Sequence, residues 1–287
     1  MVEIDLESVR LGALTWGPDD GPLAVLLHGF PDSAHTWRHL GPVLADEGYR
    51  VVAPFTRGYA PSTVPTDGRS DVGALMDDAV GVHAALGGGD DAVLVGHDWG
   101  GMTAGILAAH RDSPFRRVVA MAVPPVAALP FGETVRHLPG QLRHSWYIGF
   151  NQLPRLPERS LDRLVPKLWR DWSPGYDGRA DAAQTLAALP DAAHRKTAID
   201  YYRHLARPIG VPARYRRWQA SLRDLPTTPL LYLHGRDDAC LTPAFAEIAR
   251  SHLPDRCDVR VVDEAGHFLH LEQPDEVNSL VLDFLRG

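Results

Sequence analysis

Short apolar runs alternate with longer helical stretches at both ends of the chain. The runs predicted as strands are residues 1–6, 23–27, 50–53, 92–95, 117–122, 230–233 and 258–262. The stretches predicted as helices are residues 34–47, 71–86, 99–111, 243–252 and 274–286. Near-continuous apolar runs separated by helices are typical of parallel strands that are buried on both faces. The pattern therefore predicts an α/β protein with a mostly parallel sheet flanked by helices.

The alternation stops between about residue 124 and residue 225. This stretch is helical in pattern, rich in aromatic residues and interrupted by prolines, and it contains no comparable strand run. We predict a helical cap at residues 126–222, inserted between a first part of the core at 1–125 and a second part at 223–287. In open α/β sheets, ligands bind at the carboxyl ends of the strands, so a cap at that edge would close a pocket.

Composition narrows the class of partner. The chain has 287 residues, of which 45% are hydrophobic, which supports one large domain. A net charge of −7 gives no basic surface for nucleic acid, and no run approaches the roughly 18 apolar residues of a membrane helix. The first residues lack the pattern of a secretory signal, and two cysteines are too few for a disulfide framework. We expect a cytoplasmic protein with unpaired thiols and a small-molecule substrate; a homo-oligomer is left open.

Gly96-His97-Asp98-Trp99-Gly100 lies between a predicted strand and a predicted helix. It places an aspartate where the nucleophile elbow of α/β-hydrolases, G-x-S-x-G, carries its serine. The start of the following helix favours an anion at this position. A carboxylate can attack an sp³ carbon that bears a leaving group, and the alkyl ester that forms can be opened by water. Asp98 thus predicts cleavage of a C–O or C–halogen bond through an ester.

Two loops after strands supply a base and an acid. His267 follows the last predicted strand on a glycine-led loop, and this position singles it out among 14 histidines as the base that activates water. Asp237 and Asp238 both follow the strand at 230–233, and either could orient His267, with Asp238 preferred. His28 and His97 are interpreted as structural hydrogen-bonding residues. The chain order of nucleophile, acid and base is that of the α/β-hydrolase fold.

The loop His28-Gly29-Phe30-Pro31 follows the first core strand. We expect the backbone N–H groups of Phe30 and Trp99 to form an oxyanion hole, in which each donor contributes roughly 3 kcal/mol to the stability of a tetrahedral intermediate. The peptide bond between Phe30 and Pro31 is a candidate for the cis form, since cis prolines occur in tight turns. This chemistry requires neither a metal nor an organic cofactor.

Together these segments resemble the epoxide hydrolase branch of the α/β-hydrolase superfamily over nearly the whole chain. The segments that are similar to family motifs are His28-Gly29-Phe30-Pro31 (H-G-x-P), Arg57-Gly58-Tyr59-Ala60-Pro61-Ser62 (R-G-Y-G-x-S), Gly96 to Gly100 (G-x-D-x-G), Gly235-Arg236-Asp237-Asp238 (G-x-x-D) and Gly266-His267-Phe268. Ala60 stands where the family motif has glycine. The G-x-x-D resemblance selects Asp238 as the acid.

The resemblance also implies two cap tyrosines that hold the epoxide oxygen and donate a proton as the ring opens. Ser145 to Gln152 is similar to the segment with the first tyrosine, which assigns Tyr147. Asp200-Tyr201-Tyr202-Arg203 is similar to the segment with the second. Adjacent helical residues point about 100° apart, so only one of the pair can face Asp98, and Tyr202 is preferred over Tyr201. The implied reaction opens an epoxide to a vicinal diol.

Two other functions compete with this reading. A haloalkane dehalogenase would share the nucleophile, the base, the acid and Trp99, and one of the cap tryptophans Trp146, Trp169 and Trp172 could bind the halide. The paired tyrosines favour the epoxide. A binding protein without turnover is the other alternative, but a protein that only binds would not need the set of Asp98, Asp238 and His267.

Overall fold

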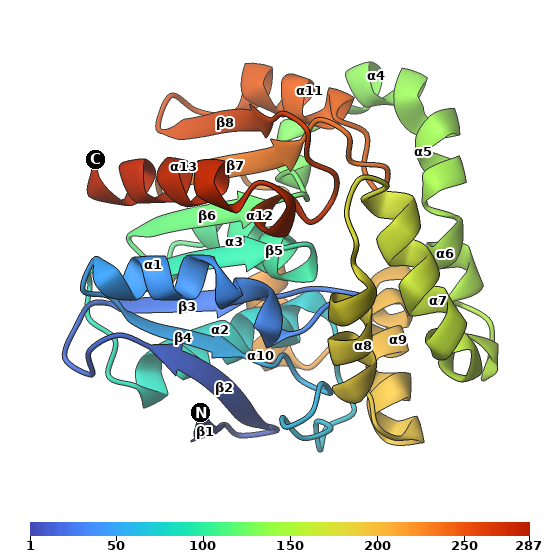
Figure 1. The fold of residues 1–287 in the computed structure, drawn as a ribbon, viewed down its shortest axis with the longest axis horizontal. Coiled ribbons are helices and arrows are strands. Elements are labelled where there is room, and N and C mark those ends of the chain that lie inside the picture. Colours follow the sequence, from blue (N-terminus) through green and yellow to red (C-terminus); the bar gives the residue numbers. More distant parts are fainter.

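The computed structural model describes all residues from 1 to 287, and an eight-stranded sheet forms its centre (Figure 1). The strands are β1 (Val2–Asp5), β2 (Arg10–Trp16), β3 (Leu23–Leu27), β4 (Arg50–Pro54), β5 (Val93–His97), β6 (Arg117–Met121), β7 (Leu230–Gly235) and β8 (Cys257–Val262). Their order across the sheet is β1-β2-β4-β3-β5-β6-β7-β8. The strands from β4 to β8 in this order pair in parallel, whereas β2 pairs antiparallel with both β1 and β4. This is the mostly parallel sheet that the sequence predicts.

Helices account for most of the remaining chain. They are α1 (Leu40–Asp46), α2 (Val72–Ala85), α3 (Trp99–Ala109), α4 (Phe131–Thr134), α5 (Leu138–His144), α6 (Trp146–Phe150), α7 (Leu156–Trp172), α8 (Arg179–Ala187), α9 (Ala192–Ala206), α10 (Ala213–Gln219), α11 (Ala244–His252), α12 (Leu269–Glu272) and α13 (Pro274–Arg286). Short 3₁₀ helices occur at Ala34–Arg38, Val126–Ala128 and Val135–His137. None of the helices is both long enough and apolar enough to cross a membrane.

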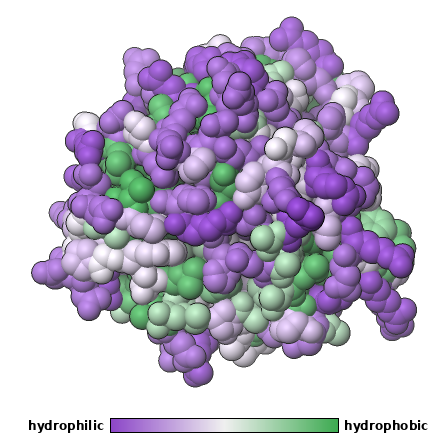
Figure 2. All heavy atoms as spheres, viewed as in Figure 1, coloured by the Kyte–Doolittle hydropathy of each residue, from purple (hydrophilic) through white to green (hydrophobic).

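The alternation of side chains along each strand builds one apolar core on each face of the sheet. On β3, Ala24 and Leu26 belong to the core that includes residues of α1 and α13. Leu23, Val25 and Leu27 point the other way, into the core that includes residues of α2, α3 and α11. A fully buried side chain of this size contributes about 1.5–3 kcal/mol to stability. The face seen in Figure 2 is accordingly covered mainly by hydrophilic residues, with hydrophobic ones in scattered patches.

Helices α5 to α9 lie beside the carboxyl ends of the parallel strands (Figure 1). They come from the segment between β6 and β7, where the sequence predicts a helical insertion. Helix α10 belongs to the same segment but packs on α2, where the Trp218 indole donates to Asp77 at 2.8 Å. The chain thus returns to the body of the sheet before β7 begins.

Candidate active site

Asp98 occupies a strained corner between β5 and α3. Its backbone has φ 52° and ψ −114°, a conformation that L-residues rarely adopt. Gly96 and Gly100 allow the corner to be this tight. A Cβ atom at Gly96 would clash with the carbonyl oxygen of Gly100, and one at Gly100 would clash with that of Leu27. The corner therefore presents the Asp98 side chain at the carboxyl edge of the sheet.

Substitution of Gly96 by alanine is expected to lower the free energy of unfolding by about 3 kcal/mol, because the new methyl group meets backbone atoms that cannot move aside. Gly140 in α5 is a matched control, since a Cβ there would meet nothing within 4 Å. Gly140→Ala should leave stability unchanged or raise it by roughly 0.5–1 kcal/mol. Urea denaturation of both variants measures the difference, and equal effects would contradict the packing argument.

The two carboxylate oxygens of Asp98 have different surroundings. Oδ1 accepts a hydrogen bond of 2.7 Å from the backbone N–H of Phe30. Oδ2 lies 3.6 Å from Nε2 of His267. No hydrogen bond to Asp98 from the Trp99 amide is present, so one of the two expected donors contacts the carboxylate in this state. The Phe30–Pro31 peptide bond is cis, as predicted.

Asp238 and His267 form a buried hydrogen-bonded pair. Nδ1 of His267 lies 2.9 Å from Oδ2 of Asp238. The other oxygen of Asp238 accepts backbone N–H groups of Cys240, at 2.7 Å, and Leu241, at 3.0 Å. Asp237, the alternative acid, is exposed to solvent. The structure therefore brings Asp98, His267 and Asp238 together and leaves Asp237 outside.

Two carboxylates determine the charge of His267. Burial alone would lower the pKa of its imidazole, but the adjacent Asp238 and Asp98 outweigh burial and raise this pKa to about 10. The same contact with His267 outweighs burial at Asp238 and holds the pKa of that carboxyl below its ordinary value. The two carboxylates therefore favour the protonated form of the His267 imidazole.

Tyr147 and Tyr202 face Asp98 from the helices beyond the sheet. Their rings lie edge to face at 5.5 Å, and both line one cavity together with Asp98. Burial, together with the nearby charge of Asp98, raises the pKa of each phenol well above its ordinary value. The neighbouring Tyr201 points elsewhere, because its hydroxyl donates to the carbonyl oxygen of Arg57 at 2.9 Å. Of the adjacent pair, only Tyr202 reaches the cavity.

The cavity has a volume of about 190 Å³ and walls that are mainly apolar. It runs from Asp98 to the surface, where Val126 and Leu205 are partly exposed. Besides the carboxylate and the two phenols, the lining includes the Ser145 hydroxyl, the Cys240 thiol and Trp99, whose indole carries an N–H donor. The site is thus shaped for an uncharged organic molecule.

Cys240 was not among the residues that the sequence analysis singled out. Its thiol lies 3.6 Å from the Tyr147 hydroxyl, and burial raises the pKa of this thiol well above its ordinary value. Cys240 is therefore a neutral residue of the cavity lining that contacts the Tyr147 hydroxyl. Nothing in its sequence context distinguishes it from a core cysteine.

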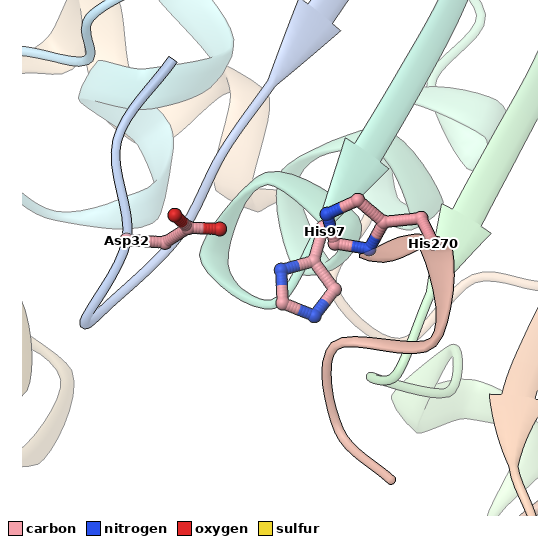
Figure 3. Close-up of side chains that lie close together, drawn as sticks. All are labelled: Asp32, His97 and His270. Atoms are coloured by element: carbon pink, nitrogen blue, oxygen red, sulfur yellow. The ribbon is translucent and has the colours of Figure 1, made fainter. Parts of the chain in front are cut away.

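A second polar cluster lies behind His267 and consists of Asp32, His97 and His270 (Figure 3). Nε2 of His97 lies 2.9 Å from the carbonyl oxygen of His267. Because a carbonyl only accepts, this nitrogen carries the proton, and burial lowers the pKa of His97 to about 3, so the ring is neutral. His97 thus fixes the backbone of the base loop, in agreement with the structural role expected of it. His28 is also neutral, since burial lowers its pKa to about 4.

Two groups of side chains have residue types and spacings that could hold a metal ion. They are the cluster of Asp32, His97 and His270, and the group of Asp238, Cys240 and His267. The second group overlaps the acid and base pair, in which the hydrogen bond between His267 and Asp238 already occupies one ligand atom of each residue. The third residue, Cys240, has its thiol beside the Tyr147 hydroxyl.

A family model described as the alpha/beta hydrolase fold matches residues 22–274. Epoxide hydrolase A of Mycobacterium tuberculosis is 32% identical to this chain, over 99% of this chain and 96% of that protein. The AB hydrolase superfamily protein YfhM of Bacillus subtilis is 31% identical over 99% of this chain and 97% of that protein. The chain belongs to the α/β-hydrolase fold family.

Solved structures agree with this assignment. The crystal structure of epoxide hydrolase A from Mycobacterium thermoresistibile matches 100% of this chain and 98% of its own, with a TM-score of 0.78 and 26% identity. A putative epoxide hydrolase from Klebsiella pneumoniae matches 100% of this chain and 97% of its own, with a TM-score of 0.81. At 24% identity, this second likeness concerns the fold alone.

Proposed function

We propose that the protein is an epoxide hydrolase that forms a covalent ester on Asp98. The observation that carries the proposal is the placement of two protonated phenols, Tyr147 and Tyr202, across one apolar cavity from an aspartate at the elbow. The relatives of this chain that are named epoxide hydrolases support it. The helical cap at residues 126–222 belongs to the same proposal, because this segment carries both tyrosines.

In the first step, Oδ2 of Asp98 attacks one carbon of the epoxide and the C–O bond to that carbon breaks. Oδ2 is the free oxygen, since Oδ1 accepts the Phe30 amide. The ring oxygen takes a proton from Tyr147 or Tyr202, so the product is a hydroxyalkyl ester and a phenolate. Their raised pKa values keep both phenols protonated until the oxygen develops charge.

The second step follows from the loss of charge at Asp98. Its carboxylate helps to raise the pKa of His267, and esterification removes that negative charge. The imidazolium can then release its proton to the phenolate and act as a base, with Asp238 still holding Nδ1. Water gives a proton to His267 and adds to the ester carbonyl, and the tetrahedral oxyanion forms at the Oδ1 position beside the Phe30 amide, with Trp99 as the second proposed donor. Collapse breaks the bond between the carboxyl carbon and the ester oxygen, the departing diol oxygen takes the proton of the new carboxyl group, and the carboxylate of Asp98 and the imidazolium of His267 are restored.

Trp99, which a dehalogenase would share, lines the cavity, but none of the three cap tryptophans does, so the cap offers no second indole donor for a halide. The indole N–H of Trp169 donates to the carbonyl oxygen of Pro31 at 2.8 Å, and Trp146 is partly exposed at the surface. Trp172 packs between Tyr147 and His267, with both ring centroids at 4.9 Å. Incubation with styrene oxide and, separately, with 1-bromobutane tests the choice. We expect styrene diol and no bromide; bromide without diol would replace the proposal by the dehalogenase.

The adjacent tyrosines offer a matched pair of variants. Tyr202→Phe is expected to lower kcat/KM for styrene oxide roughly 10²-fold, because one proton donor is lost. Tyr201→Phe removes the bond to the Arg57 carbonyl and is expected to cost about 1 kcal/mol of stability while leaving turnover in place. Steady-state assays and thermal denaturation of both variants separate these effects. A larger loss of turnover in Tyr201→Phe would show that the phenols are wrongly assigned.

A further inference from the structure

The space around Asp98 is one-sided. The residues that line the cavity come from α3, α6, α9, the loop after β7, the segment after β6 and the start of α11, and two of them, Val126 and Leu205, are exposed at the surface. Phe30, Trp172 and His267 flank the nucleophile or its base as well, but none of them lines the cavity. A bound substrate therefore finds room for a substituent on one side of the reacting ring only.

Beside the cavity, the rings of Phe30 and Trp172 pack on the two tyrosines and on His267. The Phe30 ring lies 5.3 Å from that of Tyr202, and the Trp172 ring lies 4.9 Å from those of Tyr147 and His267. Phe30 and Trp172 are at most 2% exposed. Protein interiors of this density accept even one additional methyl group only at a cost.

The wall on the open side restricts the chemistry of the substituent. Apart from the reacting groups, it offers the Ser145 hydroxyl and a Cys240 thiol that already contacts Tyr147, and no cation lines it. A substituent that carries a carboxylate would lose its hydration without gaining a partner, whereas an apolar one gains by burial. With about 190 Å³, the space is smaller than the roughly 300–1,000 Å³ of pockets for drug-sized ligands.

We infer that the enzyme is specific for terminal epoxides with a single uncharged apolar substituent, such as an aryl or alkyl group, and rejects epoxides that are trans-disubstituted. This inference rests on the proposed function and makes it narrower. The substituent lies along Met102 and Leu241 toward the mouth, and the unsubstituted carbon of the epoxide faces the packed rings. A longer substituent extends toward solvent. A second substituent, on the other epoxide carbon, would collide with the packed rings of Phe30 and Trp172.

Styrene oxide and two of its derivatives, which carry one additional methyl group at different positions, test the inference on the unaltered protein. Styrene oxide is the reference. We expect kcat/KM for trans-β-methylstyrene oxide to be roughly 10- to 200-fold lower, because its methyl group enters the packed side. The para-methylstyrene oxide carries the same methyl group on the ring, inside the cavity, and should react at a rate near the reference.

A variant of the cavity wall tests the position of the substituent independently of the substrate series. Met102→Phe narrows the cavity and should lower kcat/KM for para-methylstyrene oxide more than for propylene oxide, whose substituent is a single methyl group. Reaction of trans-β-methylstyrene oxide as fast as styrene oxide would overturn the inference while leaving the epoxide hydrolase intact. Equal effects of Met102→Phe on both substrates would also overturn it. Absence of diol from every epoxide would instead overturn the proposed function.

Discussion

Replacement of Asp98 by alanine is expected to lower kcat/KM for styrene oxide roughly 10⁴-fold or more, because no other group near the cavity can form the ester. Tyr147 and Tyr202 remain in this variant and can still polarise the epoxide, but the attacking atom is gone. Diol formation measured by chromatography gives the rate, and thermal denaturation shows whether the variant is folded.

Asp237 provides the control for this experiment. It is also an aspartate in a loop after a strand. Its side chain is exposed, however, and does not belong to the group of Asp98, His267 and Asp238. Asp237→Ala should therefore retain the turnover of the parent enzyme. If folded Asp98→Ala protein turned over styrene oxide at the parent rate, the ester mechanism would have to be abandoned.

The His267→Gln variant is expected to stop after the first step. Asp98 and both tyrosines are intact, so the ester still forms, but the variant lacks the base that activates water. Its hydrolysis should slow roughly 10²- to 10⁴-fold. Mass spectrometry of the intact protein after mixing with styrene oxide should then show an increase equal to the mass of the epoxide, and peptide mapping should locate it on Asp98.

A surface histidine is the matched control. His252 is partly exposed at the end of α11, where it pairs with Glu133 at 2.8 Å, and it does not line the cavity. His252→Gln should turn over normally and accumulate no adduct. An adduct on a residue other than Asp98 in the His267→Gln protein would argue against the assigned nucleophile.

The fold was largely predictable because its strands are buried on both faces. The run at 23–27 coincides with β3, and the other predicted core strands agree with the structure to within two residues at each end. Strand β2 was missed, since Arg10–Trp16 contains Gly12 and only one β-branched residue, Thr15. Its pairing with β4 joins segments about 40 residues apart, which local patterning does not reveal.

The helix predicted at 34–47 is two elements. A 3₁₀ helix covers Ala34–Arg38, and α1 begins only at Leu40. Pro42 explains the restart, since a proline lacks an N–H group and is tolerated in the first turn of a helix but not in its interior. A single apolar stripe runs over both pieces, so the periodicity alone cannot show the break.

The site was predictable to the extent that its residues stand at the ends of strands. Asp98 and His267 follow β5 and β8, and parallel strands bring their carboxyl ends to one edge. The choice between residues that are adjacent in the sequence required either the family resemblance or the structure. Tyr202 and Tyr201, for example, differ only in the direction of their side chains. Cys240 and the one-sided cavity depend on packing between distant segments, so no local pattern could indicate them.

The hydrogen bond from His97 to the backbone of His267 joins two parts of the mechanism mechanically. His97 is the chain neighbour of Asp98, so the residue that precedes the nucleophile holds the loop of the base. Loss of this hydrogen bond would therefore affect the loop of His267 through a residue that does not itself line the cavity.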